Sequence, residues 1–464
     1  MRLPAILDPF AAGAAPAVMT RIALDWILVS DAIDPLLDDC AEEQYSREFL
    51  LSHFVEVMAD VTCGFRKSPR AAFLKRQLDQ VASISAFYRK LNRMELPVTT
   101  AVVRQAAERA RELIVAAGGL RDEPVSGYAT RILDGNILTG TDHRLSALRW
   151  TRSAALPGMS LAVYEPASGL VLDVVLEENA HTQERALLDQ VVVRPGELWI
   201  MDRNFCVRTF LFRILRSDAF FLVRRHQSTL PFEPVEPLCA RGRCDSGEVS
   251  EQAIWVDDPE QEGRGYRLRR IVLTLDQPTR DGSGEIVLIS NLPETVTAAT
   301  CCEAYRDRWE IEGHFQKLTD LLHCEIAGLG YPRASLFAFS MAVTAGNALA
   351  VLLGSLRSVH EPALVEELSH ATLVSDIAEV YPGMMIAVPP PKWSFVTRSG
   401  LGEIAEVLRG LAIQVPVERM RRSRRGPKKP RTTKKVTGDK IHHMATKKLL
   451  DQDKGVPPPA RKKD

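Results

Sequence analysis

Three acidic residues, Asp134, Asp202 and Glu312, stand where the chain could bury a carboxylate. Asp134 lies in the run ATRILDGN beside a glycine, and Asp202 follows the apolar residues 198–201 directly. Short apolar runs after turn residues predict buried strands, so we expect both aspartates at or just beyond a strand end. Burying a carboxylate is costly unless it is paired or holds a cation. Either aspartate alone fits a turn or helix-capping residue equally well, but the three acids together favour a metal-holding cluster.

The third acid lies in residues 305–322, YRDRWEIEGHFQKLTDLL. This stretch has no proline and its apolar residues recur with a helical period, so it predicts one helix. The expected core face carries Ala304, Ile311, Phe315, Leu318 and Leu322. The adjoining stripe carries Tyr305, Arg308, Trp309, Glu312, Gln316 and Thr319. Taken alone, an amphipathic helix with surface ion pairs explains the pattern as well as a catalytic helix does.

The order Asp-Gly-Asn, Asp-Arg-Asn-Phe and Tyr-x-x-Arg-x-x-x-Glu resembles the DDE transposases of bacterial insertion sequences. Within them it is most similar to family four, whose glutamate lies in a Tyr-Arg-Glu-Lys motif. Tyr305, Arg308 and Glu312 match that motif at its spacing, and Trp309 and Ile311 match the usual Arg-Trp-x-Ile-Glu run. The looser resemblance extends from about residue 40 to about residue 432.

Two positions depart from the family pattern. The family has a lysine seven residues after the glutamate, where this chain has Thr319. Lys317 lies about 160° away from Thr319 around a helix and does not take its place. The family also favours glycine two residues after the second aspartate, where this chain has Asn204, a residue that tolerates left-handed backbone better than most. The family lysine contacts phosphate, and this chain lacks it. The alternative hypothesis is therefore a catalytically decayed copy that still binds DNA.

The resemblance implies a transposase that cuts DNA at the ends of its element and transfers the freed strand into target DNA. Asp134 would be shared by two Mg²⁺ (or Mn²⁺) ions, with Asp202 and Glu312 each completing one ion. Two such ions can stabilise both the attacking and the leaving oxygen of a phosphodiester, and Mg²⁺ prefers carboxylate oxygens. A nuclease of the same fold, which hydrolyses DNA without joining it, is the alternative enzyme.

The same resemblance assigns the DNA contacts. Tyr305 and Arg308 would hold phosphate near the break, where a guanidinium can bind two oxygens at once, and Thr319 occupies the position of the phosphate-binding lysine. Trp309 would stack on an unpaired base or, equally well, pack in the core. The partners implied are the terminal inverted repeats, the target DNA and a second copy of the chain, because two ends must be joined.

The chain has 464 residues, a length typical of about three domains. Its net charge of zero conceals an asymmetry: residues 419–464 hold 17 Lys and Arg against 4 Asp, a net charge of +13, which leaves −13 on the rest. Such a basic segment binds polyanions without reading their sequence, or only keeps the chain soluble. Its composition predicts disorder in isolation.

Apolar and turn patterns predict an α/β protein, and the resemblance makes its mixed-sheet core ribonuclease-H-like. The expected organisation is a helical region that binds the element ends or only packs (1–122), the first core part (123–225), a β-rich insertion (226–287), the second core part with C-terminal helices (288–415) and the basic tail (416–464). The apolar residues 336–356 are interpreted as a buried helix, because Gly346, Asn347 and Gly354 interrupt them. This interpretation predicts no membrane anchor, and the resemblance implies a cytoplasmic, nucleoid-associated bacterial protein.

Overall fold

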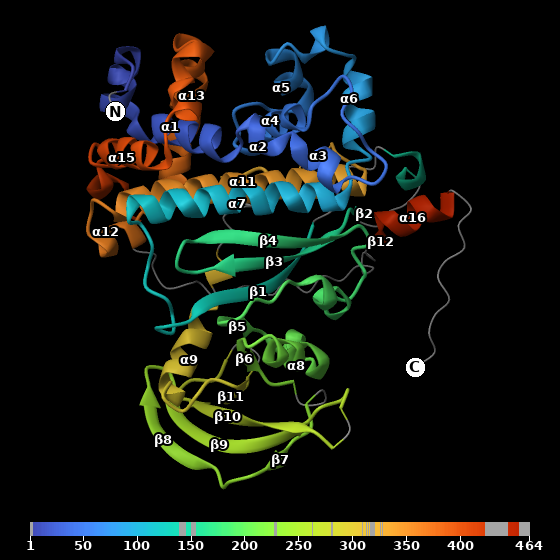
Figure 1. The fold of residues 1–464 in the computed structure, drawn as a ribbon, viewed down its shortest axis with the longest axis vertical. Helices are drawn as coiled ribbons and strands as arrows, with labels where there is room; N and C mark the ends of the chain where they lie inside the picture. The colour runs from blue at the N-terminus through green and yellow to red at the C-terminus, as the bar shows by residue number, and fades with distance from the viewer. Residues whose placement is uncertain are drawn as a thin grey trace, which may run out of the picture.

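The structure is a computed structural model, which describes residues 3–138, 145–149, 155–226, 230–261, 263–279, 282–308, 310–311, 313, 315, 321–324, 326, 328–422 and 444–453. In these residues a large mixed β-sheet lies beneath a layer of helices (Figure 1). The fold is therefore mixed α/β, as the sequence predicts.

Helices fill the chain before the sheet begins. They are α1 (Asp8–Ile27), α2 (Ser30–Ile33), α3 (Pro35–Cys40), α4 (Leu51–Thr62), α5 (Pro69–Lys75), α6 (Ile84–Leu91) and α7 (Leu96–Ala117). Ser68 caps α5 by accepting a hydrogen bond from the Ala71 backbone N–H at 3.2 Å. Helix α7 ends at Gly118, whose φ of 72° lies in the left-handed region that favours glycine.

The helices after the sheet are α11 (Pro332–Arg357), α12 (Pro362–Glu366), α13 (His370–Ala387), α14 (Phe395–Arg398) and α15 (Leu401–Ala412). They share one apolar core with α1, α4 and α7. Helices α7 and α11 run side by side across the sheet (Figure 1). Where they meet, a Cβ on Gly119 would overlap the backbone carbonyl of Gly354. The first 122 residues are helical as expected, yet they complete their core only with the C-terminal helices.

The strand order of the sheet is β4-β3-β1-β5-β6-β11-β10-β9-β7, with β8 paired to β9. Its first half contains β1 (Ala129–Ile137), β3 (Met159–Glu165), β4 (Leu170–Glu177), β5 (Glu197–Met201) and β6 (Phe220–Arg224). Strands β1, β3 and β4 are antiparallel neighbours, whereas β5 is parallel to β1 and β6 is parallel to β5. The parallel arrangement brings the carboxyl ends of β1 and β5 to the same edge.

The expected β-rich insertion forms the second half of this sheet. It contains β7 (Glu233–Pro234), β8 (Cys239–Cys244), β9 (Gly247–Asp257), β10 (Gly265–Leu275) and β11 (Glu285–Ser290). Strand β11 pairs antiparallel with β6, so these strands extend the sheet of the core directly. An edge strand presents unpaired backbone groups, and the β6–β11 pairing covers that edge.

The helix expected over residues 305–322 is divided. Helix α9 (Ala298–Asp307) begins at Thr297, whose side chain accepts a hydrogen bond from the Thr300 backbone N–H, and it ends before Arg308, which lies in a turn. Residues 310, 311, 313 and 315 are helical again. The described residues thus form two helical parts of the predicted stretch, and Arg308 between them keeps helical φ and ψ of −49° and −31°.

Part of the basic tail also departs from the expectation of disorder. Residues 417–420 form a short 3₁₀ helix, and the Arg422 backbone N–H donates to the Glu367 carbonyl at 2.8 Å. Residues Met444–Ala445 form β12, which pairs parallel with β2 (Ala155–Leu156). Helix α16 (Thr446–Asp453) follows, and Ala445, Thr446 and Leu449 are buried. Composition missed these two anchored segments because only a few apolar residues fix each of them.

Two helical segments among the described residues are long and apolar enough to span a membrane by length and composition, Ala5–Ile33 and Pro332–Arg357. In the fold, 61% and 89% of their most apolar windows are buried by protein. Asn347 is buried in α11, and its side chain bonds both backbone groups of Val171 in β4 at 2.9–3.0 Å. Helix α11 is thus a core helix here, as its interrupting polar and glycine residues predict.

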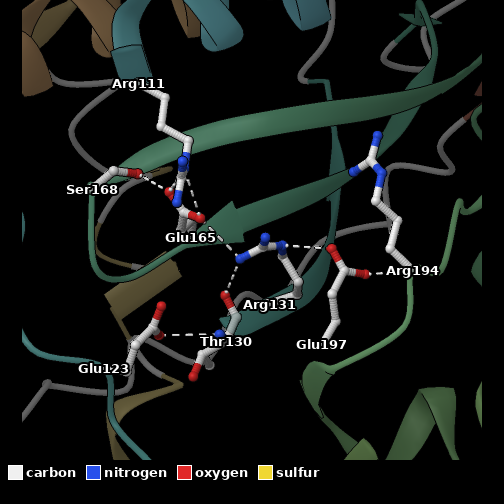
Figure 2. Close-up of polar contacts among 8 residues, drawn as sticks. All are labelled: Arg111, Glu123, Thr130, Arg131, Glu165, Ser168, Arg194 and Glu197. Carbon is white, nitrogen blue, oxygen red and sulfur yellow. Dashed lines mark hydrogen bonds and ion pairs between the residues drawn. The ribbon is translucent and has the colours of Figure 1, made fainter. Parts of the chain in front are cut away.

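A network of buried charges ties β1, β3 and β5 together near the amino end of β1 (Figure 2). Arg131 donates to Glu197 and to Glu165, both at 3.0 Å. Glu165 is fully buried and also accepts from Arg111 at 3.0 Å and from the Ser168 hydroxyl at 2.6 Å. Each carboxylate therefore has several charge-assisted or neutral donors, which offset the cost of its burial.

Candidate active site

Parallel pairing places Asp134 and Asp202 next to each other. Leu133 of β1 pairs with Met201 of β5, so the two aspartates are the next residues along neighbouring strands. Neighbouring strands lie about 4.8 Å apart. Both carboxylates thus reach the same small region at the carboxyl ends of the strands, as the sequence predicts.

The two aspartates face the same side of the sheet. Side chains alternate along a strand, and Ile132 and Ile200 belong to the core between the sheet and helices α9 and α11. Asp134 and Asp202 each follow two residues later and continue that face. The Asp134 side chain is 20% exposed, so it is open to a ligand.

Tyr305 of α9 contacts the second aspartate. Its phenolic O–H donates to the Asp202 Oδ1 at 3.2 Å, although the residue is only 5% exposed. Burial, and then the charge of Asp202, raise the pKa of Tyr305. The phenol therefore keeps its proton and remains a donor that orients the carboxylate.

Arg308 contacts the first aspartate from the turn that follows α9. One guanidinium nitrogen lies 3.7 Å from the Asp134 Oδ2, and the guanidinium also lies 5.8 Å from the centre of the Tyr305 ring. The Arg308 side chain is only 5% exposed. The break in the helix thus places a buried cation directly at the carboxylate pair.

Three predicted site residues, Trp309, Glu312 and Thr319, lie outside the described residues. Their neighbour Ile311 is fully buried in the same core as Tyr305. Within the described part of the chain, no three His, Cys, Asp or Glu residues are grouped to hold an ion. The structure brings together Asp134, Asp202, Tyr305 and Arg308, and the position of the third acid stays a prediction.

No sequence pattern indicated Glu184, which lies behind the two aspartates in the 3₁₀ helix η4 (Glu184–Gln190). A Cβ on Gly135 would overlap the Glu184 carboxylate, and the side-chain amide of Asn204 donates to that same carboxylate. Gly135 follows Asp134 and so faces the opposite side of the sheet, where η4 packs. Glu184 thus contacts Gly135, next to Asp134, and Asn204, two residues after Asp202. A glycine next to an acid was the only signal for this close approach.

The donor set fits a hard divalent cation. Two carboxylates lie on one face at adjacent strand ends, one of them partly open to solvent. Oxygen ligands of this kind suit Mg²⁺ or Mn²⁺, which keep several water ligands and need few from the protein. Arg308 lies at ion-pair distance, 3.7 Å, from Asp134 Oδ2, so its charge would act on any anion bound beside the carboxylates.

Comparisons with known proteins place these residues within a matched segment. Residues 126–329 match the family described as Transposase DDE domain. The chain is 24% identical over 199 residues to the putative transposase InsL of insertion sequence element IS186A of Escherichia coli K12, covering 35% of this chain. It is equally similar to the transposase of insertion sequence element IS421 of Escherichia coli. The chain spans about half (52%) the length of these relatives.

A solved structure, the piggyBac transposase synaptic complex with hairpin DNA, aligns over 81% of this chain and 82% of that one. The TM-score is 0.37 and the sequence identity is 10%.

Proposed function

We propose that this chain is the transposase of a bacterial insertion sequence and cuts and joins DNA at the ends of its element. The observation that carries the proposal is the pairing of Asp134 with Asp202 on adjacent parallel strands, with Tyr305 and Arg308 against them. The match to the transposase domain over residues 126–329 supports it. The assignment to family four rests on the Tyr-Arg-Glu spacing of Tyr305, Arg308 and Glu312.

The carboxylates of Asp134, Asp202 and Glu312 would hold two Mg²⁺ or Mn²⁺ ions. Bound there, the ions would lower the pKa of water and neutralise charge on the phosphate. Tyr305 orients the Asp202 carboxylate by donating a hydrogen bond to its Oδ1. Arg308 lies close enough to Asp134 to hold a phosphate oxygen beside it, and Trp309 and Thr319 follow on the same segment as further DNA contacts.

The sheet order supports a ribonuclease-H-like core, since β4, β3 and β1 are antiparallel and β5 and β6 continue parallel to β1. We assign recognition of the terminal inverted repeats to the helices of residues 1–122 and general phosphate binding to the basic tail. Joining two ends requires two sites, so the active form on DNA is a homodimer. These activities place the protein at the nucleoid in the cytoplasm.

One observation favours a second candidate, a decayed transposase that binds DNA without cutting it. Thr319 stands where the family has lysine, and threonine brings no charge to the phosphate. The variant Thr319→Lys separates the two candidates, because it restores cutting only if the metal site is intact.

The decisive experiment is a cleavage and strand-transfer assay with Mg²⁺ or Mn²⁺ on DNA that carries the ends of the element. Asp134→Ala, Asp202→Ala and Glu312→Ala should each lower cutting and joining on the order of 10³-fold, as expected for a few kcal/mol of lost transition-state stabilisation. The matched control is Asp173→Ala, an acid on β4 that pairs with Arg104 away from the site. Activity that survives Asp134→Ala would refute the site, and cutting without joining would indicate a nuclease.

A further inference from the structure

A cavity of about 320 Å³ lies against helix α11. Its walls come from α11, from the turn between β3 and β4, from α12 and from Glu310, Gly313, Leu321 and Leu322. Leu349 and Leu353 form apolar parts of its wall, and Arg121, Arg357 and Arg422 also line it. Three guanidinium groups around one small cavity are an arrangement that needs a chemical explanation.

Arg357 is the most buried of the three, with a side chain that is 7% exposed. Its Nε donates to the Gly119 carbonyl at 2.9 Å, while its Nη2 is buried without a hydrogen-bond partner among the described residues. Burial, and then the charge of Arg121, lower the pKa of Arg357 to about 10. The two arginines therefore lie close enough to repel each other, and a buried donor remains free.

Arg121 also has a buried N–H group without a hydrogen-bond acceptor. Its Nη2 donates to the Tyr164 hydroxyl at 3.3 Å, whereas its Nε is buried and has no partner among the described residues. Burial raises the pKa of Tyr164 to about 12, so that this hydroxyl keeps its proton and adds a polar atom to the wall. A buried N–H without an acceptor costs about 1–3 kcal/mol, and each of these two arginines carries one.

The carboxylates at the cavity do not balance these cations. Glu366 lies 3.8 Å from both Arg121 and Arg357, and Glu310 lies 3.4 Å from Arg121. Their side chains are 51% and 40% exposed, so solvent screens both. Arg422 adds a third positive charge and bonds only the Leu368 carbonyl among the contacts described for its side chain. Among the described lining residues, three arginines and two glutamates thus leave one more positive than negative charge.

We propose that this cavity is a binding site for a small phosphate-bearing molecule. A phosphate offers several oxygen acceptors and two charges, which match the guanidinium groups of Arg121 and Arg357 in the cavity wall. A duplex is about 20 Å wide and does not enter a space of this volume, which lies at the small end of ligand pockets. The site is separate from the carboxylate pair, yet Glu310 contacts its Arg121 and lies only two residues from Arg308.

The test is calorimetric titration of the full chain with inorganic pyrophosphate, without DNA or divalent metal. We expect saturable one-to-one binding that weakens at least tenfold in Arg357→Met. The matched control is Arg104→Met, which removes an equally charged side chain from an exposed ion pair with Asp173 and should leave the affinity unchanged. Circular dichroism verifies that each variant is folded.

Because Arg357 is buried, a second variant keeps the proposal testable if Arg357→Met fails to fold. Glu366→Gln changes a half-exposed side chain and removes the carboxylate that competes for both arginines, so pyrophosphate should bind several-fold more tightly. A purely structural role for the arginines predicts no gain. Absence of pyrophosphate binding to the wild-type chain, equal loss in Arg104→Met, or unchanged affinity in Glu366→Gln would overturn the proposal. Competition by a short duplex at equal phosphate concentration would also overturn it, because DNA backbone would then be the ligand.

Discussion

Replacing Arg131 by methionine tests how much the buried charge network contributes to stability. Arg131 is 10% exposed in its side chain and bonds Glu165 and Glu197 (Figure 2). Without it, Glu165 keeps Arg111 and the Ser168 hydroxyl. Glu197, 5% exposed in its side chain, would keep the Arg194 backbone N–H as its remaining donor among the described contacts. Removing one partner of a buried ion pair costs about 3–5 kcal/mol, and the geometry places most of that cost on Glu197.

The assay is urea unfolding followed by circular dichroism and by tryptophan fluorescence, since Trp199 is buried and pairs in register with Arg131. Agreement of the two signals is required before a free energy of unfolding is derived. Arg104→Met is the control: Arg104 is 48% exposed and pairs with Asp173 at 2.7 Å, and an exposed pair of this kind contributes less than about 1 kcal/mol.

A double variant identifies the cause of the loss. In Arg131→Met with Glu197→Gln, the uncompensated carboxylate is gone, so part of the lost stability should return. The reasoning is refuted if Arg131→Met costs no more than Arg104→Met. It is also refuted if the double variant is no more stable than the single one, because the cost would then come from packing.

Three further predictions concern the site and the tail. Asn204→Gly introduces the residue favoured by the family and removes the amide that donates to Glu184. It should raise the metal concentration needed for half-maximal cutting several-fold. An unchanged metal response would show that Glu184 does not position the aspartates. The pKa of Tyr305 is raised in the folded protein, so the unfolded chain loses this proton first and the free energy of unfolding of the wild type falls as pH rises above 10. In Tyr305→Phe this fall should be smaller. Urea unfolding at pH 9 and pH 11 measures the difference. Deleting residues 444–464 should lower the unfolding midpoint, because the buried residues of β12 and α16 then leave β2 uncovered; an unchanged midpoint would mean that this segment adds no stability.

The sequence predicted those parts of the site that depend on local pattern. Apolar runs that end at Asp134 and Asp202 indicated two strands, and these strands are neighbours in the sheet. The three-residue spacing of Tyr305 and Arg308 indicated that both side chains lie on one face of a helix. In the structure Tyr305 contacts Asp202 and Arg308 contacts Asp134. These local patterns predict the site correctly because side chains alternate along a strand, so the buried face of each strand determines which residues point toward the core.

The remaining features depend on contacts between distant residues. The approach of Arg308 to Asp134 joins residues 174 positions apart in the chain, which no helical period reveals. Glu184 has its place only because η4 packs behind Gly135. The pairing of β11 with β6, which joins the insertion to the core sheet, likewise depends on register between segments more than 60 residues apart.

The shared core of α1, α7 and α11 has a consequence for how the protein is made. Helix α1 leaves the ribosome about 300 residues before α11 begins. At about 5–20 residues per second, its apolar surface waits roughly 15–60 s for the partner that buries it. The same surface makes Ala5–Ile33 apolar enough to resemble a membrane span. We therefore expect nascent chains of this protein to expose α1 until α11, α13 and α15 have been made, which is the kind of surface that chaperones bind.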